Sequence, residues 1–191
     1  MKTKLIILSL LVVGIVAVGY SSGYSQALGS PTRGGQPPII TAYFAPEQVR
    51  FGDPLKIYIA GEDPDGDMLR VAVVVWQLGY GDYVTDWTYL KPADQGSFKG
   101  YLQWNTSSAT ILPENTRVTL TISIFDKAGN ESNEVVVPMV FVSSLASYPP
   151  VPASFDQKDV HMLGHVMTNL RNPIKDTEGR HGMFLFPFRH R

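Results

Sequence analysis

Three aspartates on alternate residues are the strongest chemical signal in the sequence, because carboxylates in this pattern can gather around a hard cation. Asp63, Asp65 and Asp67 lie in a stretch that also contains a proline and a glycine, a composition that favours a tight turn. Ca²⁺ takes about six to eight oxygen ligands, and alternate residues of a turn can supply several of them. Glu62 and Asp126 could add further oxygens, so these five residues form the candidate calcium site.

The same turn also has a purely structural explanation. Pro64 fixes its own φ, Gly66 accepts a positive φ, and aspartate side chains accept hydrogen bonds from nearby backbone amides. The stretch is not an EF-hand loop, because the twelfth position counted from Asp63 is Val74, where that loop needs a bidentate glutamate. Two interpretations therefore stand: a calcium site, and a solvated turn capped by its own aspartates.

Aromatic side chains are dense between Trp76 and Trp104. Tyr80, Tyr83 and Trp87 are the candidates for an exposed aromatic surface. Such a surface could anchor a protein partner or stack on a sugar, because aromatic side chains give a large contact area at a low cost in entropy. The alternative is that strand alternation turns about half of these side chains into the core.

Two histidines stand four residues apart near the C-terminus. A short helix predicted over 159–170 would place His161 and His165 on one face, where they could hold a metal or face a partner. No glutamate follows the first histidine, as the zinc hydrolase motif requires, and Gly164 weakens the helix. We therefore predict that both histidines face a partner or solvent and are not part of a catalytic metal site.

No motif of catalysis is present in the sequence. It has no Gly-x-Ser-x-Gly nucleophile elbow and no phosphate-binding glycine loop, and its complete lack of cysteine excludes disulfides, thiolate nucleophiles and thiolate metal sites. The net charge is −1 and the cations are scattered, which argues against a nucleic-acid partner. We predict a protein that is not an enzyme, with no cofactor except the candidate calcium and no identifiable small-molecule substrate.

The elements that must position these residues are short strands. Between residues 39 and 142, short runs of β-branched and aromatic residues alternate with turn signals, which is typical of an all-β sandwich. Pro138 lacks the amide needed in a strand ladder, so its position is expected at an edge or a bulge. The predicted strands cover residues 39–44, 55–60, 68–76, 83–90, 98–104, 118–124 and 134–142.

Three turn segments carry a resemblance to a known fold. They are Phe51-Gly52-Asp53, the acidic stretch 62–67, and Asp126-Lys127-Ala128-Gly129-Asn130-Glu131-Ser132. Together with the strands they resemble the immunoglobulin-like and cadherin-like modules of bacterial surface and periplasmic proteins. The resemblance implies a seven-stranded, antiparallel immunoglobulin-like sandwich over residues 39–142, and it strengthens the expectation of calcium. The cysteine pair of antibody domains is missing, so the resemblance concerns the architecture only.

The N-terminus has the charge pattern of an export signal. Lys2 and Lys4 precede an apolar run over residues 5–20. We predict a signal-anchor or transmembrane helix over residues 1–27 that contacts the lipid bilayer through 5–20. The alternative is a cleaved signal peptide, with Ser25-Gln26-Ala27 as the cleavage pattern. Either way, the rest of the chain is expected outside the cytoplasmic membrane, in the periplasm of a bacterial cell envelope.

Both segments that flank the predicted sandwich lack apolar periodicity. Residues 28–38 are rich in Gly, Ser and Pro and read as a linker, and residues 143–191 read as an extended, Pro-containing docking tail. Three explanations of the tail compete: it wraps a partner subunit, enters the membrane interface, or folds back on the sandwich. Its candidate partner-binding residues are Tyr148, Phe155, His161, His165, Phe184, Leu185, Phe186 and Phe188.

These features favour a non-catalytic accessory or structural subunit of a larger membrane-bound protein complex. In this interpretation the sandwich lies on the extracytoplasmic face, the apolar segment lies in the bilayer, and the tail contacts neighbouring subunits. The alternative is an exported ligand-binding or adhesion module that depends on calcium or binds carbohydrate.

Overall fold

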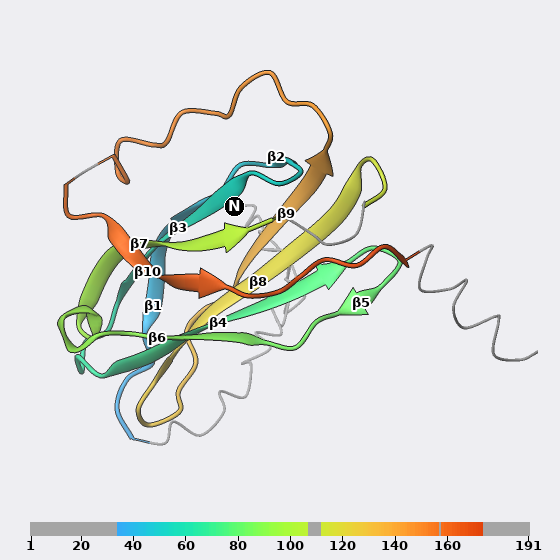
Figure 1. Ribbon diagram of the computed structural model, residues 1–191. Coiled ribbons are helices and arrows are strands. Elements are labelled where there is room, and N and C mark those ends of the chain that lie inside the picture. Colours follow the sequence, from blue (N-terminus) through green and yellow to red (C-terminus); the bar gives the residue numbers. More distant parts are fainter. Residues whose placement is uncertain (1–33, 107–111, 157, 174–191) are drawn as a thin grey trace, which may run out of the picture. The chain divides into compact units, whose positions relative to one another are not determined.

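The computed structural model describes residues 34–106, 112–156 and 158–173, and these form two β-sheets with one short 3₁₀ turn, η1 (Pro92–Asp94). Sheet A has the order β1-β3-β7-β10, and sheet B has the order β2-β9-β8-β4-β5, with β6 also paired to β4 (Figure 1). The strands are β1 (Ile39–Phe44), β2 (Gln48–Arg50), β3 (Pro54–Glu62), β4 (Met68–Gln77), β5 (Gly81–Asp82), β6 (Asp86–Tyr89), β7 (Ser97–Asn105), β8 (Thr116–Asp126), β9 (Val135–Val142) and β10 (His161–Val166).

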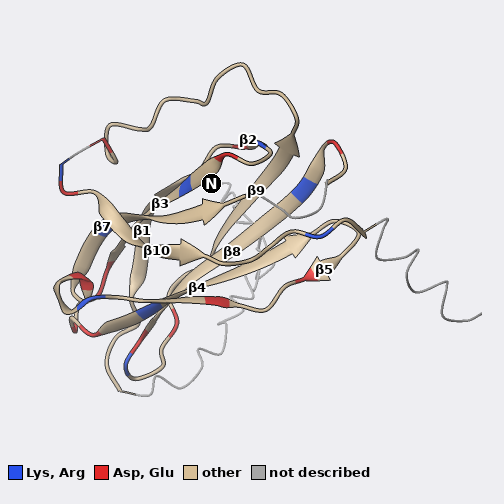
Figure 2. Cartoon of the chain, in the orientation of Figure 1, with Lys and Arg blue, Asp and Glu red and all other residues tan. Residues whose placement is uncertain are grey.

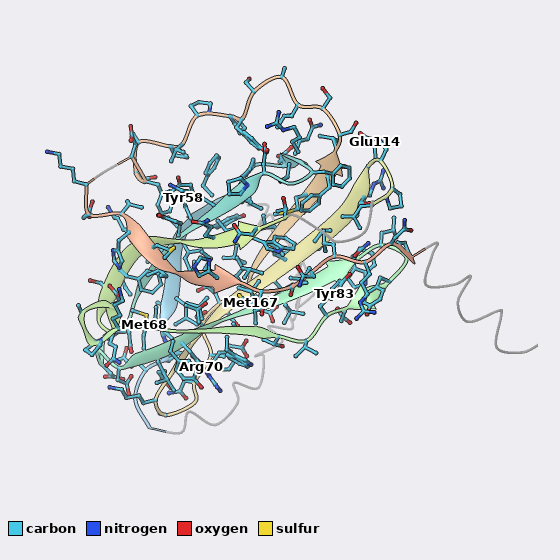
Figure 3. All side chains as sticks on the ribbon, in the orientation of Figure 1. Tyr58, Met68, Arg70, Tyr83, Glu114 and Met167 are labelled. Carbon is cyan, nitrogen blue, oxygen red and sulfur yellow. The ribbon has the colours of Figure 1, made fainter. Side chains whose placement is uncertain are left out.

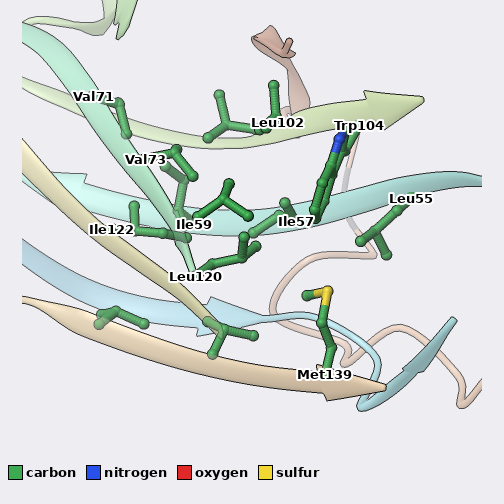
Figure 4. Packing of buried hydrophobic residues seen from close by; sticks show 14 of the residues in the cluster. Leu55, Ile57, Ile59, Val71, Val73, Leu102, Trp104, Leu120, Ile122 and Met139 are labelled. Carbon is green, nitrogen blue, oxygen red and sulfur yellow. The ribbon is translucent and has the colours of Figure 1, made fainter. Parts of the chain in front are cut away.

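The core lies between the two sheets and comes from strand alternation. In β3 the buried Leu55, Ile57 and Ile59 alternate with outward-facing residues, and β8 repeats this pattern. β7 pairs with β3 in sheet A, and its Leu102 and Trp104 belong to the same core cluster as the β3 residues (Figure 4). Burial of each such side chain contributes about 1.5–3 kcal/mol to folding, so these central strands hold the two layers together.

The strand order is that of an immunoglobulin-like sandwich. In that fold, strands A, B, E and D form one sheet and strands C, F and G form the other. Here β1, β3 and β7 take the places of A, B and E, while β4, β8 and β9 take those of C, F and G. The predicted immunoglobulin-like β-sandwich is therefore confirmed as the fold of the described residues.

Two details of the prediction are wrong. The described residues form ten strands, not seven, because β2, β5 and β10 were not predicted. The sandwich is also not wholly antiparallel, since β2 runs parallel to β9 and β10 runs parallel to β7. All three missed strands have at most six residues, so pairing with a neighbour, not their own sequence pattern, makes them strands.

Pro138 lies at an edge, as predicted. It pairs with Thr119 of β8 on one side, while β2 covers the other side of β9 only from Val140 to Val142. The edge of β1 is covered differently: the Asn133 side chain accepts a hydrogen bond from Ile40 N at 2.8 Å and donates one to Ile40 O at 3.2 Å. Pro138 on β9 and the Asn133 side chain on β1 each hinder the pairing of another strand with that edge.

Residues 143–173 fold back on the sandwich in the part that the structure describes, which is one of the three explanations considered for the tail. The Phe155 ring lies 5.5 Å from that of Tyr58 on sheet A, and Val166 and Leu170 belong to the main core. The helix predicted over 159–170 is wrong, because the chain there forms β10 on the edge of β7. Residues 174–191, with Phe184, Leu185, Phe186 and Phe188, lie outside the described residues.

The predicted N-terminal segment 1–27 also lies outside the described residues. Within residues 34–106, 112–156 and 158–173, no helix is long and apolar enough to span a membrane. The described end of the predicted linker contacts the sandwich: Gln36 N donates a hydrogen bond to Asp65 Oδ2, and Gly34 O accepts one from Asn130 Nδ2 at 2.9 Å.

Candidate functional site

The aspartate turn is held by hydrogen bonds to its own backbone. Asp63 is only 6% exposed; its Oδ1 accepts a hydrogen bond from Asp65 N at 3.1 Å, and its Oδ2 accepts one from Asp67 N at 2.9 Å. Gly66 adopts a φ of 72°, which a side chain would disfavour. Asp63 therefore caps the turn, as the structural interpretation requires.

Asp126 plays the same part in the hairpin between β8 and β9. Its Oδ1 accepts a hydrogen bond from Asn130 N, and its Oδ2 accepts one from Asn130 Nδ2, both at 2.7 Å. The turn predicted at 126–130 is therefore closed by its first and last residues. The two acidic turns also touch, since Lys127 N donates to Asp67 O at 3.1 Å.

Asp67 is the member of this acidic group whose carboxylate is not fully satisfied by hydrogen bonds. Its Oδ1 is buried and has no hydrogen-bond partner among the described residues. Burial raises the pKa of the Asp67 carboxyl, and the hydrogen bond with Asp63 and the charge of Asp126 raise it further. Glu62 is exposed at the end of β3. Across the described ranges, no group of three acidic or histidine side chains is arranged to hold a metal ion.

The outer face of sheet B is an exposed surface of unusual composition. Along β4, β6, β8 and β9, none of the outward-facing residues is Asp, Glu or Lys, whereas Asp82 of β5, which pairs with Trp76, lies on the same face. Acidic residues of the described chain lie mainly in turns and at the ends of strands (Figure 2). The members are Arg70, Ala72, Val74 and Trp76 of β4, Trp87 and Tyr89 of β6, Arg117, Thr119, Thr121, Ser123 and Phe125 of β8, and Val136, Pro138 and Val140 of β9.

Arg70 is the centre of an aromatic cluster at one end of this face. Its guanidinium carbon lies 3.9 Å from the centre of the Trp87 ring and 5.9 Å from that of Phe125. The two rings meet edge to face at 5.5 Å. Cation–π contact orients the guanidinium, but no carboxylate of the described residues pairs with it, and its Nε is buried without a hydrogen bond.

Large apolar side chains continue along the outer face of sheet B. Trp87 is 42% exposed, Tyr89 63%, Val136 53% and Trp76 39%. Exposed apolar residues that share one surface commonly mark an interaction site, whereas isolated ones need no explanation. Arginine and aromatic residues are also enriched in protein interfaces, and Lys, Asp and Glu are depleted there.

The chain's own segment 143–156 lies against part of the outer face of sheet A. Tyr148 fastens this segment: its hydroxyl donates to Asp53 Oδ2 at 2.9 Å and accepts from Arg50 N at 3.1 Å. The Arg50 guanidinium bonds Asp53 at 2.8 Å, and this bond, with that from Tyr148, lowers the pKa of the Asp53 carboxyl. Phe155, 4% exposed, then packs on the sheet, so Tyr148 and Phe155 contact their own sandwich.

The predicted aromatic surface is divided between two places. Tyr80 and Tyr83 stack at 4.6 Å beyond the end of β4, and Tyr83 faces inward, where its hydroxyl donates a hydrogen bond to Gln77. Trp87 lies with Arg70 near the other end of β4, and Figure 3 shows Arg70 well apart from Tyr83. Sequence reasoning therefore found Trp87 but missed Arg70 as its neighbour, although the alternation of β4 places Arg70 and Trp76 on one face.

The two histidines do not form a pair. In a strand, residues four apart lie about 13 Å from each other, so His161 and His165 cannot share a metal as on a helix. His161 Nε2 lies 3.0 Å from Asp94 Oδ1, while His161 Nδ1 lies 3.1 Å from Asp159 O. The Asp159 carbonyl, followed by Asp94, raises the pKa of His161. His165 is exposed.

No protein-family model and no curated protein matches this chain. Among solved structures, the PKD domain of an M14-like peptidase from a Thermoplasmatales archaeon is 16% identical with a TM-score of 0.40, over 57% of this chain and 99% of that one. The CARDB domain of a Pyrococcus furiosus protein, in complex with di-metal ions, is 9% identical with a TM-score of 0.34, over 58% of this chain and 96% of that one.

An alkylpurine DNA glycosylase from Pseudomonas fluorescens, bound to DNA, is 11% identical with a TM-score of 0.37. The match covers 55% of this chain and 30% of the glycosylase. TM-scores of this size support no argument about activity, metal binding or partners. The assignment of the fold therefore rests on the strand order of the two sheets.

Proposed function

We propose that this protein is a non-catalytic protein-binding module that contacts its partner through the outer face of sheet B. One observation carries the proposal: the chain packs its own segment 143–156 on part of the outer face of sheet A, where Phe155 contacts Tyr58, and leaves Trp87, Tyr89 and Val136 of sheet B exposed. Along β4, β6, β8 and β9 the exposed face has the arginine and aromatic residues of an interface centre and no Lys, Asp or Glu; Asp82 of β5 lies at its margin.

The edges of the sheets favour docking on a face over the addition of a strand. The Asn133 side chain already bonds the backbone N–H and C=O of Ile40 at the edge of β1. Pro138 has no amide hydrogen to donate along the unpaired part of β9. On the other side, β10 lies against β6, since Asp86 Oδ2 of β6 accepts hydrogen bonds from Met167 N and Thr168 N just after β10. A partner therefore meets side chains, with Arg70 and Trp87 as its anchors.

The proposed partner is another subunit of a larger membrane-bound complex. This part of the proposal is supported by the sequence: the apolar run 5–20 behind two lysines would place the chain at the membrane of a bacterial envelope, with the sandwich on the extracytoplasmic side. The phenylalanines of 184–188 would add contacts to a neighbouring subunit. The protein then acts as an accessory part that links neighbours.

A pair of matched substitutions tests the proposal. Val136 is 53% exposed on the outer face of sheet B, and Val84 is 90% exposed in the loop before β6. After extraction in mild detergent, the wild-type chain should co-elute with a large complex in size-exclusion chromatography. Val136→Glu should release the chain, because it buries an unpaired charge in the interface, while Val84→Glu should leave the complex intact.

Two results would contradict the proposal. Elution of the wild-type chain by itself would remove the larger complex and favour the alternative, an exported adhesion or ligand-binding module that uses Trp87 and Tyr89 for contact. Equal behaviour of Val136→Glu and Val84→Glu, with unchanged thermal melting, would show that the outer face of sheet B is not the interface.

A further inference from the structure

β10 is the edge strand of sheet A, where it also contacts β6 of sheet B, and two glycines allow this close packing. A Cβ added to Gly100 of β7 would lie 2.6 Å from Leu163 Cγ, and a Cβ added to Gly164 of β10 would lie 2.5 Å from Thr88 Cγ2 of β6. Gly100 thus lets β10 approach sheet A, and Gly164 lets it approach sheet B. The end of the strand is anchored by the buried Val166, whereas its first two residues, His161 and Met162, are exposed and depend on fewer contacts.

His161, the first residue of β10, makes two of those contacts with its imidazole. Nε2 lies 3.0 Å from a carboxylate oxygen of Asp94 in η1, and Nδ1 lies 3.1 Å from the carbonyl of Asp159. Both neighbours are acceptors, so both ring nitrogens must carry a proton for both bonds to form. A neutral imidazole has one N–H and turns a lone pair toward one of the acceptors.

We propose that His161 is a proton-controlled latch: the imidazolium fastens the start of β10 to η1, and loss of its proton loosens this part of the strand and uncovers the edge of β7 beside it. Asp94 is 6% exposed, so its carboxylate gains little from water when the imidazolium is lost. The latch therefore opens because a poorly hydrated carboxylate loses its counter-charge and the neutral ring can keep only one of the two hydrogen bonds.

The charged groups around His161 come from every element that packs on it. They line or adjoin one polar cavity at the end of sheet A. Among these charges, Asp94 favours the charged imidazole and Lys91 opposes it. These groups are Asp94 of η1, Lys91 just before η1, Glu62 of β3, Lys99 of β7 and Asp159 in the approach to β10.

The direction of the pH dependence follows from the pKa of His161, which the Asp159 carbonyl and Asp94 raise above its ordinary value. A group whose pKa is higher in the folded state stabilises that state fully below the unfolded pKa, about 6.5 for histidine. This stabilisation is lost as the pH rises through the folded pKa. Acid therefore closes the latch and mild alkali opens it.

The open form presents a new surface. β10 pairs with β7 from Gly100 to Trp104, so release of its start leaves the backbone donors and acceptors of that part of the edge unpaired. An unpaired edge of this kind accepts an extended strand from another protein. The inference does not depend on the proposed interface, because β7 belongs to sheet A and the interface belongs to sheet B.

Hydrogen exchange of backbone amides tests the latch on the full chain. Protection factors, which correct for base-catalysed exchange, would be measured between about pH 5 and about pH 8, alongside the NMR titration of His161. In the wild type, protection of the amides at the start of β10 should be lost as His161 titrates, while that of the β8 amides stays constant. In His161→Gln, the protection of these β10 amides should be low and independent of pH.

The same strand offers a matched control. His165→Gln removes an exposed histidine of β10 and should keep the wild-type pH dependence, while Asp94→Asn should reduce it. Constant protection of β8 shows in each variant that the sandwich remains folded. The latch is overturned if β10 protection does not change as His161 titrates, or if His161→Gln retains the wild-type pH dependence.

Discussion

The indole Nε1 of Trp104 donates a hydrogen bond to the backbone carbonyl of Thr168 at 2.8 Å, across 64 residues of sequence. Trp104 is 1% exposed, so its N–H needs a partner within the protein. The partner comes from the segment after β10, outside the range 39–142 that the sequence marks as the sandwich. Residues 161–171 therefore belong to the same core.

Leu170→Ala should destabilise the sandwich by about 2–5 kcal/mol, since Leu170 is 5% exposed and its truncation leaves a cavity beside the core. Urea unfolding followed by tryptophan fluorescence measures the change. Met167→Ala is the matched control, because Met167 is 72% exposed and should cost little. Equal effects of the two substitutions would contradict the integration of this segment.

Gln77→Ala should lower the free energy of unfolding by about 1–3 kcal/mol. Gln77 is completely buried; its Nε2 donates to Arg171 O at 2.7 Å, and its Oε1 accepts from Arg171 N at 3.3 Å and from the Tyr83 hydroxyl. Truncation leaves these groups without their partner. Leu78→Ala, at a 53% exposed neighbour, serves as the control in the same denaturation experiment.

Asp67→Asn should stabilise the protein at pH 7. Burial and neighbouring carboxyls raise the pKa of Asp67 in the folded state, so its ionisation opposes folding as the pH rises through that pKa. An uncharged amide removes this penalty, and the gain should shrink as the pH falls toward about 4, where the carboxyl of an aspartate takes up its proton. Denaturation at several pH values would contradict this account if the gain were the same throughout or if Asp65→Asn gave an equal one.

Calcium should leave the melting temperature unchanged, because both Asp63 oxygens already accept backbone hydrogen bonds and so hold the turn without an ion. Melts with millimolar calcium and with a chelator make the comparison. A ligand that binds only the folded state raises stability in proportion to RT ln(1 + [L]/Kd), so a clear rise with calcium would restore the ion-binding interpretation.

The fold could be predicted where strands carry their own pattern. Ile39–Phe44 was predicted with both ends, and the alternation of residues 118–124 marked the centre of β8, because one buried face imposes a period of two. The capping of the 63–67 turn by its own aspartate and the turn that begins at Asp126 followed from turn chemistry alone. Local sequence is sufficient for these features because each involves residues close together in the chain.

What the sequence did not reveal depends on register between distant strands. Arg70 meets Trp87 and Phe125 only because Arg70 pairs with Tyr89 on one side and with Phe125 on the other. The histidine spacing favoured a helix, since no local signal shows that the edge of β7 is available to His161–Val166. Gly164 is the residue that indicates a strand here, because glycine weakens a helix and also allows β10 to pack closely against β6.

The late position of β10 has a consequence for biosynthesis. His161 pairs with Gly100, so both strands of the hairpin β8–β9 must be made before β7 receives its outer neighbour. Until then, a growing chain carries an uncovered strand edge beside Trp104, and such edges invite aggregation. We therefore expect ribosome-bound chains that end before residue 161 to need a chaperone, which the completed sandwich can do without.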